Sequence, residues 1–133
     1  MTREEIREKT MQLVYQMDIA EEFDYEKLSP IDESLSVLSK KQAVNVLEII
    51  RDHISEIDET IFKNTSNWSP SRIAKADLAI LRTAVAEMLF CEDVPRSVSI
   101  NEAVELGKKY GDEKSYAFIN SVLSKVDKAN DAW

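Results

Sequence analysis

Glycine and proline are scarce in this chain of 133 residues, which contains two glycines and three prolines. Both residue types cost free energy inside helices and are common in turns. Their scarcity therefore argues against a turn-rich all-β fold, a collagen-like sequence and a flexible linker. The length suits one domain and is sufficient to bury a hydrophobic core without disulfide bonds. The composition predicts a single all-α domain covering residues 1–133.

Cysteine content and hydropathy predict a cytoplasmic protein. The single cysteine, Cys91, excludes an internal disulfide framework and a zinc site made of several cysteines. No stretch approaches the roughly 18 apolar residues of a membrane span. The opening MTREEIREK is not a signal peptide. We therefore expect a protein of a reducing compartment with no membrane segment.

Negative charge is concentrated in the first half of the chain. The net charge is −8 at pH 7, of which residues 1–66 contribute −7 and residues 67–133 contribute −1. An acidic protein repels a phosphate backbone at long range. Any binding of nucleic acid must therefore be local or shared with a basic partner.

Capping signals and apolar spacing predict about seven helices joined by short connections. Two kinds of signal mark helix starts, namely capping boxes and an N-cap serine followed by proline. In chain order these signals are Thr2-x-x-Glu5, Ser29-Pro30, Ser39-x-x-Gln42, Ser69-Pro70 and Ser99-x-x-Glu102. A break near residues 74–76 divides the segment after Ser69 into a short helix and a long one. Gly111 stops the next helix, and Asp112 caps the last.

Two loops are expected to divide these helices into groups. One is acidic and lies near residues 21–29, and the other lies near residues 62–69. The sequence therefore predicts two small packed helical bundles, covering about residues 1–66 and 67–133.

Residue types that carry catalysis are sparse. His53 is the single histidine and is expected at a surface or boundary position, while Cys91 is expected as a small buried side chain. A glycine-rich phosphate loop is excluded, because the two glycines are Gly107 and Gly111. We expect no catalytic residue, no metal ligand and no cofactor, and therefore not an enzyme.

Three segments are more specific than general helix patterns. In chain order they are REKTMQLVY at 7–15, DLAILRTAVAE at 77–87, and a third made of SINEAVEL at 99–106, KYG at 109–111 and FINSVL at 118–123. Together these segments resemble the NusB family of transcription antitermination factors, and the resemblance runs from about Arg3 to Lys125. The third segment is the most specific part of this resemblance, because its three motifs follow one another at a spacing that would rarely arise by chance.

The resemblance implies an all-helical fold of two small bundles and a function in binding rather than catalysis. A member of this family binds the boxA segment of ribosomal RNA leader transcripts as a heterodimer with NusE, a small-subunit ribosomal protein. The complex joins the elongating RNA polymerase and suppresses premature termination.

The resemblance also implies which residues contact RNA. Aromatic side chains stack on the bases of single-stranded RNA, and basic side chains contact its phosphates. The positions that match the family's RNA surface are Arg3, Arg7, Lys9, Tyr15, Lys114 and Phe118.

The chain departs from the family pattern at its amino-terminal helix. Many members carry a run of arginines there, whereas acids interrupt the bases in the segment REEIREK at residues 3–9. Some relatives carry an acid and a base where this chain has Lys114 and Ala117. Each lost phosphate contact weakens binding. We therefore expect weak RNA binding by the protein alone and a greater dependence on NusE.

Partner contacts are expected on the second half of the chain. Arg82 and Glu87 match positions that the family uses against NusE, and a spacing of five residues separates them by about 140° around a helix. Glu102 is expected to serve as the capping-box acid with Ser99 rather than as a ligand.

Other interpretations remain open from the sequence alone. The chain is alternatively a helical protein-interaction module without specific RNA binding. It is alternatively a fragment of an RNA cytosine methyltransferase, a class that can carry a similar helical domain but also needs a cofactor-binding α/β domain. The sequence also leaves open whether the free protein forms a homodimer that hides its RNA surface.

Overall fold

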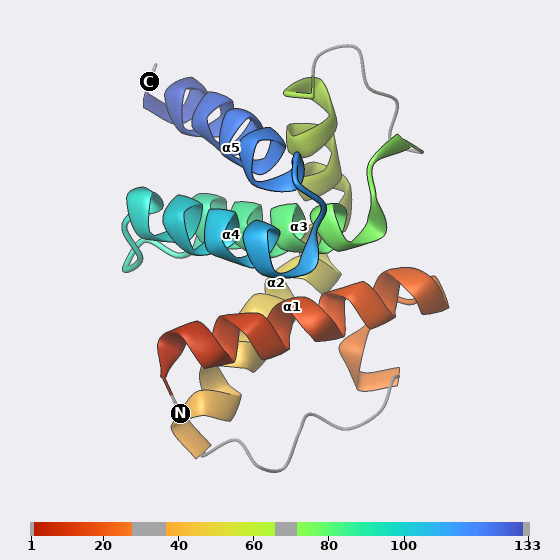
Figure 1. Cartoon of the computed structure of the whole chain (residues 1–133). Coiled ribbons are helices and arrows are strands. Elements are labelled where there is room, and N and C mark those ends of the chain that lie inside the picture. The colour runs from red at the N-terminus through yellow and green to blue at the C-terminus, as the bar shows by residue number, and fades with distance from the viewer. Residues whose placement is uncertain (1, 28–36, 66–71, 132–133) are drawn as a thin grey trace.

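The structure is a computed structural model, and it describes residues 2–27, 37–65 and 72–131. All regular secondary structure in the described part of the chain is helical, and that part contains no strand (Figure 1). They are α1 (Arg3–Ala20), the 3-10 helix η1 (Tyr25–Lys27), α2 (Val37–Lys63), α3 (Lys75–Phe90), α4 (Arg96–Tyr110) and α5 (Ser115–Asp131). None of these helices is both long and apolar enough to cross a membrane.

The prediction of an all-α fold is confirmed, whereas the count of about seven helices is wrong for the described residues, which form five α-helices. The helix expected after Ser29-Pro30 and the cap at Ser69-Pro70 fall on residues 28–36 and 66–71, outside the described part. Residues 73–74 are not helical and α3 begins at Lys75, while most of the short helix expected before this break falls outside the described part.

Of the predicted N-caps that lie in the described part of the chain, one is confirmed and others are not. Thr2 does cap α1, because its hydroxyl oxygen accepts a hydrogen bond from the Glu5 amide at 3.1 Å. The prediction for Ser99 is wrong. Helix α4 begins at Arg96 directly after Pro95, and the Ser99 amide already donates to the Pro95 carbonyl. Ser39 likewise lies inside α2 rather than at its start. Both serines fit the capping pattern, but Ser99 lies three residues inside α4 and Ser39 lies inside the described part of α2.

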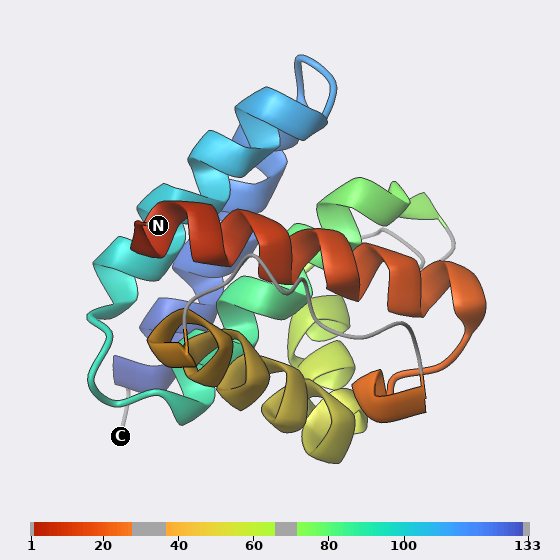
Figure 2. The same ribbon diagram turned by 90° about the horizontal axis from the view of Figure 1, so that it is seen from below.

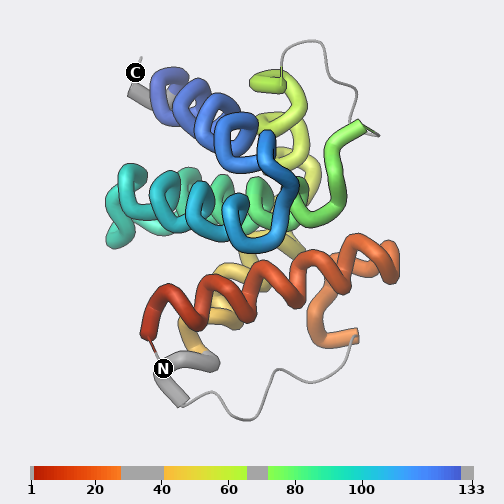
Figure 3. The backbone as a smooth tube through the Cα atoms, viewed as in Figure 1, coloured from red at the N-terminus to blue at the C-terminus, as the bar shows by residue number. Residues whose placement is uncertain are grey.

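Helix α3 is the centre of the fold. Every residue from Asp77 to Met88 is buried, and α1, α2, α4 and α5 all pack against it (Figures 1 and 3). A helix that is buried on all sides belongs to the interior of a protein. The small residues in this helix allow neighbouring helices to approach it from several directions.

The expectation of two separate bundles is not matched. One hydrophobic core runs through the described residues from Met11 in α1 to Val126 in α5, and it includes side chains from all five α-helices. Helix α2 also crosses the molecule, as two helical segments that meet at a kink at His53, where a φ of −129° departs from helical geometry. The His53 ring stacks on Phe90 at the end of α3, with 4.3 Å between ring centroids.

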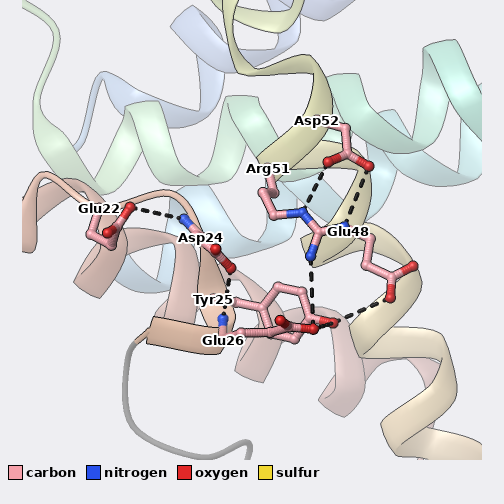
Figure 4. A network of polar contacts seen from close by, with 7 residues as sticks. All are labelled: Glu22, Asp24, Tyr25, Glu26, Glu48, Arg51 and Asp52. Carbon is pink, nitrogen blue, oxygen red and sulfur yellow. Dashed lines mark hydrogen bonds and ion pairs between the residues drawn. The ribbon is translucent and has the colours of Figure 1, made fainter.

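Helix η1 is attached to α2 by a polar network in a segment expected to be an acidic loop (Figure 4). The Tyr25 hydroxyl donates to Glu48 Oε1 at 3.2 Å, and the Arg51 guanidinium lies 5.6 Å from the centre of the Tyr25 ring. Arg51 also lies 3.8 Å from a Glu26 carboxylate oxygen and donates to Asp52. These contacts hold the segment that follows α1 against the outside of α2.

Helices α4 and α5 form an antiparallel pair whose connecting turn projects beyond the rest of the molecule (Figure 2). Gly111 ends α4, as predicted. A Cβ atom added to Gly111 would clash with Cβ and Oγ of Ser115. The Ser115 hydroxyl in turn accepts a hydrogen bond from the Asp112 amide at 3.0 Å. Asp112 Oδ1 accepts from the Lys114 amide at 2.8 Å.

Substitution of Gly111 tests this close approach. We expect Gly111→Ala to lower the free energy of unfolding by about 1–3 kcal/mol, because the added methyl group forces Ser115 out of the turn. Urea unfolding followed by circular dichroism measures the effect. Ser121→Ala is the control, since Ser121 is exposed on α5 and lies away from the turn. An unchanged unfolding midpoint for Gly111→Ala would contradict this account.

Candidate nucleic-acid interface

The residues expected to contact RNA lie on α1 and around the start of α5. Tyr15 is 39% exposed on the outer face of α1. Lys114 is exposed in the turn before α5, and Phe118 lies one helical turn further on, half-buried against the core. The Phe118 amide donates to the Lys114 carbonyl at 3.1 Å, so these two residues are neighbours. Lys9 is half-buried on α1.

Arg3 and Arg7 face a different direction from Tyr15. Both line a pocket of about 90 Å³ between α1, α2 and the connection from α3 to α4. Cys91 lies in the same pocket, and burial raises the pKa of its thiol to about 11, with Glu87 and Asp93 acting in the same direction. The thiol is therefore neutral at physiological pH and is a weak nucleophile.

Arg7 and Glu87 form an ion pair with each other. Arg7 Nε lies 2.9 Å and 3.1 Å from the two Glu87 carboxylate oxygens. The two side chains are only 13% and 6% exposed. The buried Ser99 hydroxyl donates to Glu87 Oε2 at 3.0 Å, which explains what this serine does instead of capping α4. One residue expected to contact RNA and one expected to contact a partner therefore join α1 to α3.

Arg82 joins α3 to α2 and to the end of α1 that lies away from Arg7. Its guanidinium donates to both carboxylate oxygens of Asp58 at 2.8 Å and 2.9 Å, and Nη1 lies 3.5 Å from Asp18 Oδ1. The guanidinium also lies 4.8 Å from the centre of the Phe23 ring. Arg82 is 5% exposed and Glu87 is 4% exposed, so ordinary surface charge does not describe either residue.

Glu8 connects the outer face of α1 to the last turn of α4. Its carboxylate accepts from Lys109 Nζ at 2.6 Å and from the Tyr110 hydroxyl. Gln12, one turn further along α1, donates to the same hydroxyl at 2.8 Å. The hydrogen bond from Lys109 lowers the pKa of Glu8, and the bond from Tyr110 adds to this effect. We name Glu8, Gln12, Lys109 and Tyr110 the α1–α4 latch.

The sequence-based reasoning missed two exposed tyrosines. Tyr110 and Tyr116 are 36% and 45% exposed, and both lie near the turn between α4 and α5. A lysine ammonium lies 5.6 Å from the Tyr110 ring centre and another lies 5.7 Å from that of Tyr116. The KKY run before Gly111 was the available signal, but at the sequence level it served as part of the family motif and not as an RNA contact.

The described residues contain no cluster of three or more histidine, cysteine, aspartate or glutamate side chains placed to hold a metal ion. The arrangement on α1, α4 and α5 instead combines exposed aromatic rings with lysines, which is the chemistry that single-stranded nucleic acids require.

The Arg7–Glu87 pair predicts a strong and non-additive effect on stability. Removing one partner leaves an uncompensated buried charge. Arg7→Gln and Glu87→Gln should therefore each lower the free energy of unfolding by about 3–5 kcal/mol, and the double variant should lose less than their sum. Urea unfolding of the unmodified protein, the two single variants and the double variant gives the coupling free energy between the two residues.

A surface ion pair provides the control for this double-mutant cycle. Lys108 and Glu105 lie 3.2 Å apart with side chains 53% and 67% exposed, and such pairs contribute about 0–1 kcal/mol. If the effects at Arg7 and Glu87 were additive and as small as those at the surface pair, the two residues would not be coupled as a buried ion pair.

Comparisons with known proteins agree with this fold. The sequence model of the NusB family matches residues 4–128. The transcription antitermination protein NusB of Clostridium tetani is 40% identical over 151 residues, covering 96% of this chain and 99% of that protein. The solved structure of T. maritima NusB is similar, with a TM-score of 0.87 and 31% identity, covering 96% of this chain and 92% of that one.

A further similarity is to a chain in the crystal structure of the antitermination factors NusB and NusE in complex with dsRNA. The TM-score is 0.77 at 26% identity, and the match covers 97% of this chain and 99% of that one. The family match extends over almost the whole chain, and the helices superpose on those of solved members. The chain therefore belongs to the NusB family.

Proposed function

We propose that this protein is a transcription antitermination factor. It binds the boxA RNA of ribosomal RNA leader transcripts together with NusE, and it helps the RNA polymerase elongation complex to read through terminators. The function is binding and scaffolding, with no catalysed reaction. The observation that carries the proposal is the set of exposed aromatic and basic side chains where α1 meets the α4–α5 turn, in a member of the NusB family.

The surface supports contacts to single-stranded RNA. Tyr15 offers an exposed ring, Lys114 an exposed ammonium and Phe118 a partly exposed ring beside it. Stacking of a base on an aromatic side chain contributes about 1–3 kcal/mol. Arg3 is exposed in the first turn of α1 and adds a phosphate contact.

Two acidic side chains reduce the positive charge available to RNA by pairing with basic ones. Glu87 holds Arg7 inside the molecule, and Glu8 holds Lys109 in the α1–α4 latch. With a net charge of −8, the protein alone binds RNA weakly, because few cations remain to replace the counterions of the phosphates. A basic partner supplies the missing charge, which accounts for binding as a heterodimer with NusE.

Arg82 and Glu87 support the partner surface from inside the protein. Each is an internal ion-pair partner, and each fixes how α1 lies on α3. We infer that these two residues hold the NusE-binding face in shape, so their substitution weakens partner binding through the position of α1.

A fluorescence-anisotropy titration tests the proposed function. A labelled single-stranded boxA-like RNA is titrated with the protein, with and without NusE, at two salt concentrations. A scrambled RNA and a duplex RNA serve as controls. The proposal predicts selective binding to boxA that strengthens when NusE is present. Equal affinity for boxA and scrambled RNA with NusE present would overturn it in favour of a protein-interaction module, and tighter binding to the duplex would overturn the single-stranded mode.

Substitution of Glu8 should strengthen RNA binding. Glu8→Gln keeps a hydrogen-bonding group beside Tyr110 but releases the Lys109 ammonium, which adds about one phosphate contact. The slope of log K against log salt should steepen by about 0.7. Glu59→Gln removes the same charge from an exposed position on α2 and serves as the control. Equal affinities and salt slopes for the two variants would show that the latch does not compete with RNA.

A further inference from the structure

An exposed tyrosine beside a lysine lies at the tip of the α4–α5 pair, and neither residue is among the RNA contacts named above. Tyr116 is in the first turn of α5 and is 45% exposed. Lys108 is in the last turn of α4, and its ammonium lies 5.7 Å from the centre of the Tyr116 ring. The turn that joins the two helices projects from the molecule (Figure 2), so this pair is accessible to a large ligand.

The position of Tyr116 is fixed by its backbone rather than by its side chain. Gly107 lies against it, and a Cβ atom on Gly107 would lie 3.3 Å from Tyr116 Cα. The side chain itself has no structural task among the described residues: its hydroxyl makes no hydrogen bond there, whereas the Tyr25 and Tyr110 hydroxyls do. The backbone of Tyr116 is thus fixed, and its exposed aromatic ring is available for binding.

Lys108 is similarly available. It donates to Glu105 Oε1 at 3.2 Å, but both side chains are more than half exposed. An exposed ion pair of this kind contributes about 0–1 kcal/mol, so a phosphate can replace the carboxylate at little cost. By contrast, the neighbouring Lys109 is held by Glu8 in the α1–α4 latch.

We propose that Lys108 and Tyr116 form a further contact for single-stranded RNA, in which a base stacks on the Tyr116 ring and its phosphate binds Lys108. Aromatic rings flanked by cations are the usual platform for unpaired nucleotides. Tyr116 and Phe118 are two residues apart and therefore face nearly opposite sides of α5. An RNA strand that passes Phe118 and Lys114 continues around the helix start to Tyr116.

This inference rests on the proposed RNA-binding function and is tested with the same anisotropy titration, at saturating NusE. We expect Tyr116→Ala to weaken binding of the boxA-like RNA at least about fivefold, the lower end of the stacking contribution. Tyr116→Phe should bind like the unmodified protein, because it keeps the ring. Val98→Ala is the matched control, since Val98 is similarly exposed at the far end of α4.

The contribution of Lys108 is tested separately, through the salt dependence of RNA binding. Lys108→Gln should flatten the slope of log K against log salt by about 0.7, the contribution of one phosphate contact to a single strand. Lys128→Gln makes the same charge change at the distant end of α5 and should leave the slope as it is. Both variants alter exposed side chains, so their thermal unfolding should match that of the unmodified protein.

The outcomes separate this inference from the proposed function. Selective RNA binding that is insensitive to Tyr116→Ala, with Lys108→Gln equal to Lys128→Gln, would overturn the inference alone. An unmodified protein without selective RNA binding would overturn the proposed function and the inference with it. Loss of affinity in Tyr116→Ala but not in Tyr116→Phe, with the flatter slope in Lys108→Gln, would establish the contact.

Discussion

The burial of α3 on all sides determines how the other helices are arranged. Three ionisable residues on this helix, Asp77, Arg82 and Glu87, are nonetheless buried, and the last two are only 5% and 4% exposed. A buried charge is tolerated when it is paired and hydrogen-bonded. Arg82 is paired with Asp58 of α2 and Asp18 of α1, and Glu87 is paired with Arg7 of α1. Helix α1 is therefore attached to α3 at two places, near its beginning and near its end.

This attachment determines which face of α1 is left for ligands. The face that carries Arg7 is directed inward, and the face that carries Glu8 and Tyr15 is directed outward toward the end of α4. The α4–α5 turn beyond that end of α4 carries further exposed tyrosines, each with a lysine ammonium near its ring. Aromatic contacts thus account for more of the proposed RNA surface than arginines do, in keeping with the acid-interrupted bases of the first helix.

The all-α class, the cap at Thr2 and the stop at Gly111 were predictable, because each depends on neighbours in the sequence. The roles of Arg7 and Glu87 were not, since their pairing joins residues 80 positions apart. Sequence patterns also misplaced Ser99, whose hydroxyl binds Glu87 instead of capping a helix. The two-bundle expectation was wrong because periodicity identifies helices but does not show that one of them is buried on every side.

Chemical-shift mapping tests the central claim most directly, namely that RNA binds the outward face of α1 together with the α4–α5 turn while the internal ion pairs stay formed. The isotope-labelled protein would be titrated with boxA-like RNA in the presence of NusE, and spectra compared before and after RNA is added. The account predicts shifts at Tyr15, Lys108 and Tyr116, with the Arg7 side-chain Nε–H signal unchanged. Shifts concentrated on α2, or a large change at Arg7 Nε–H, would contradict it.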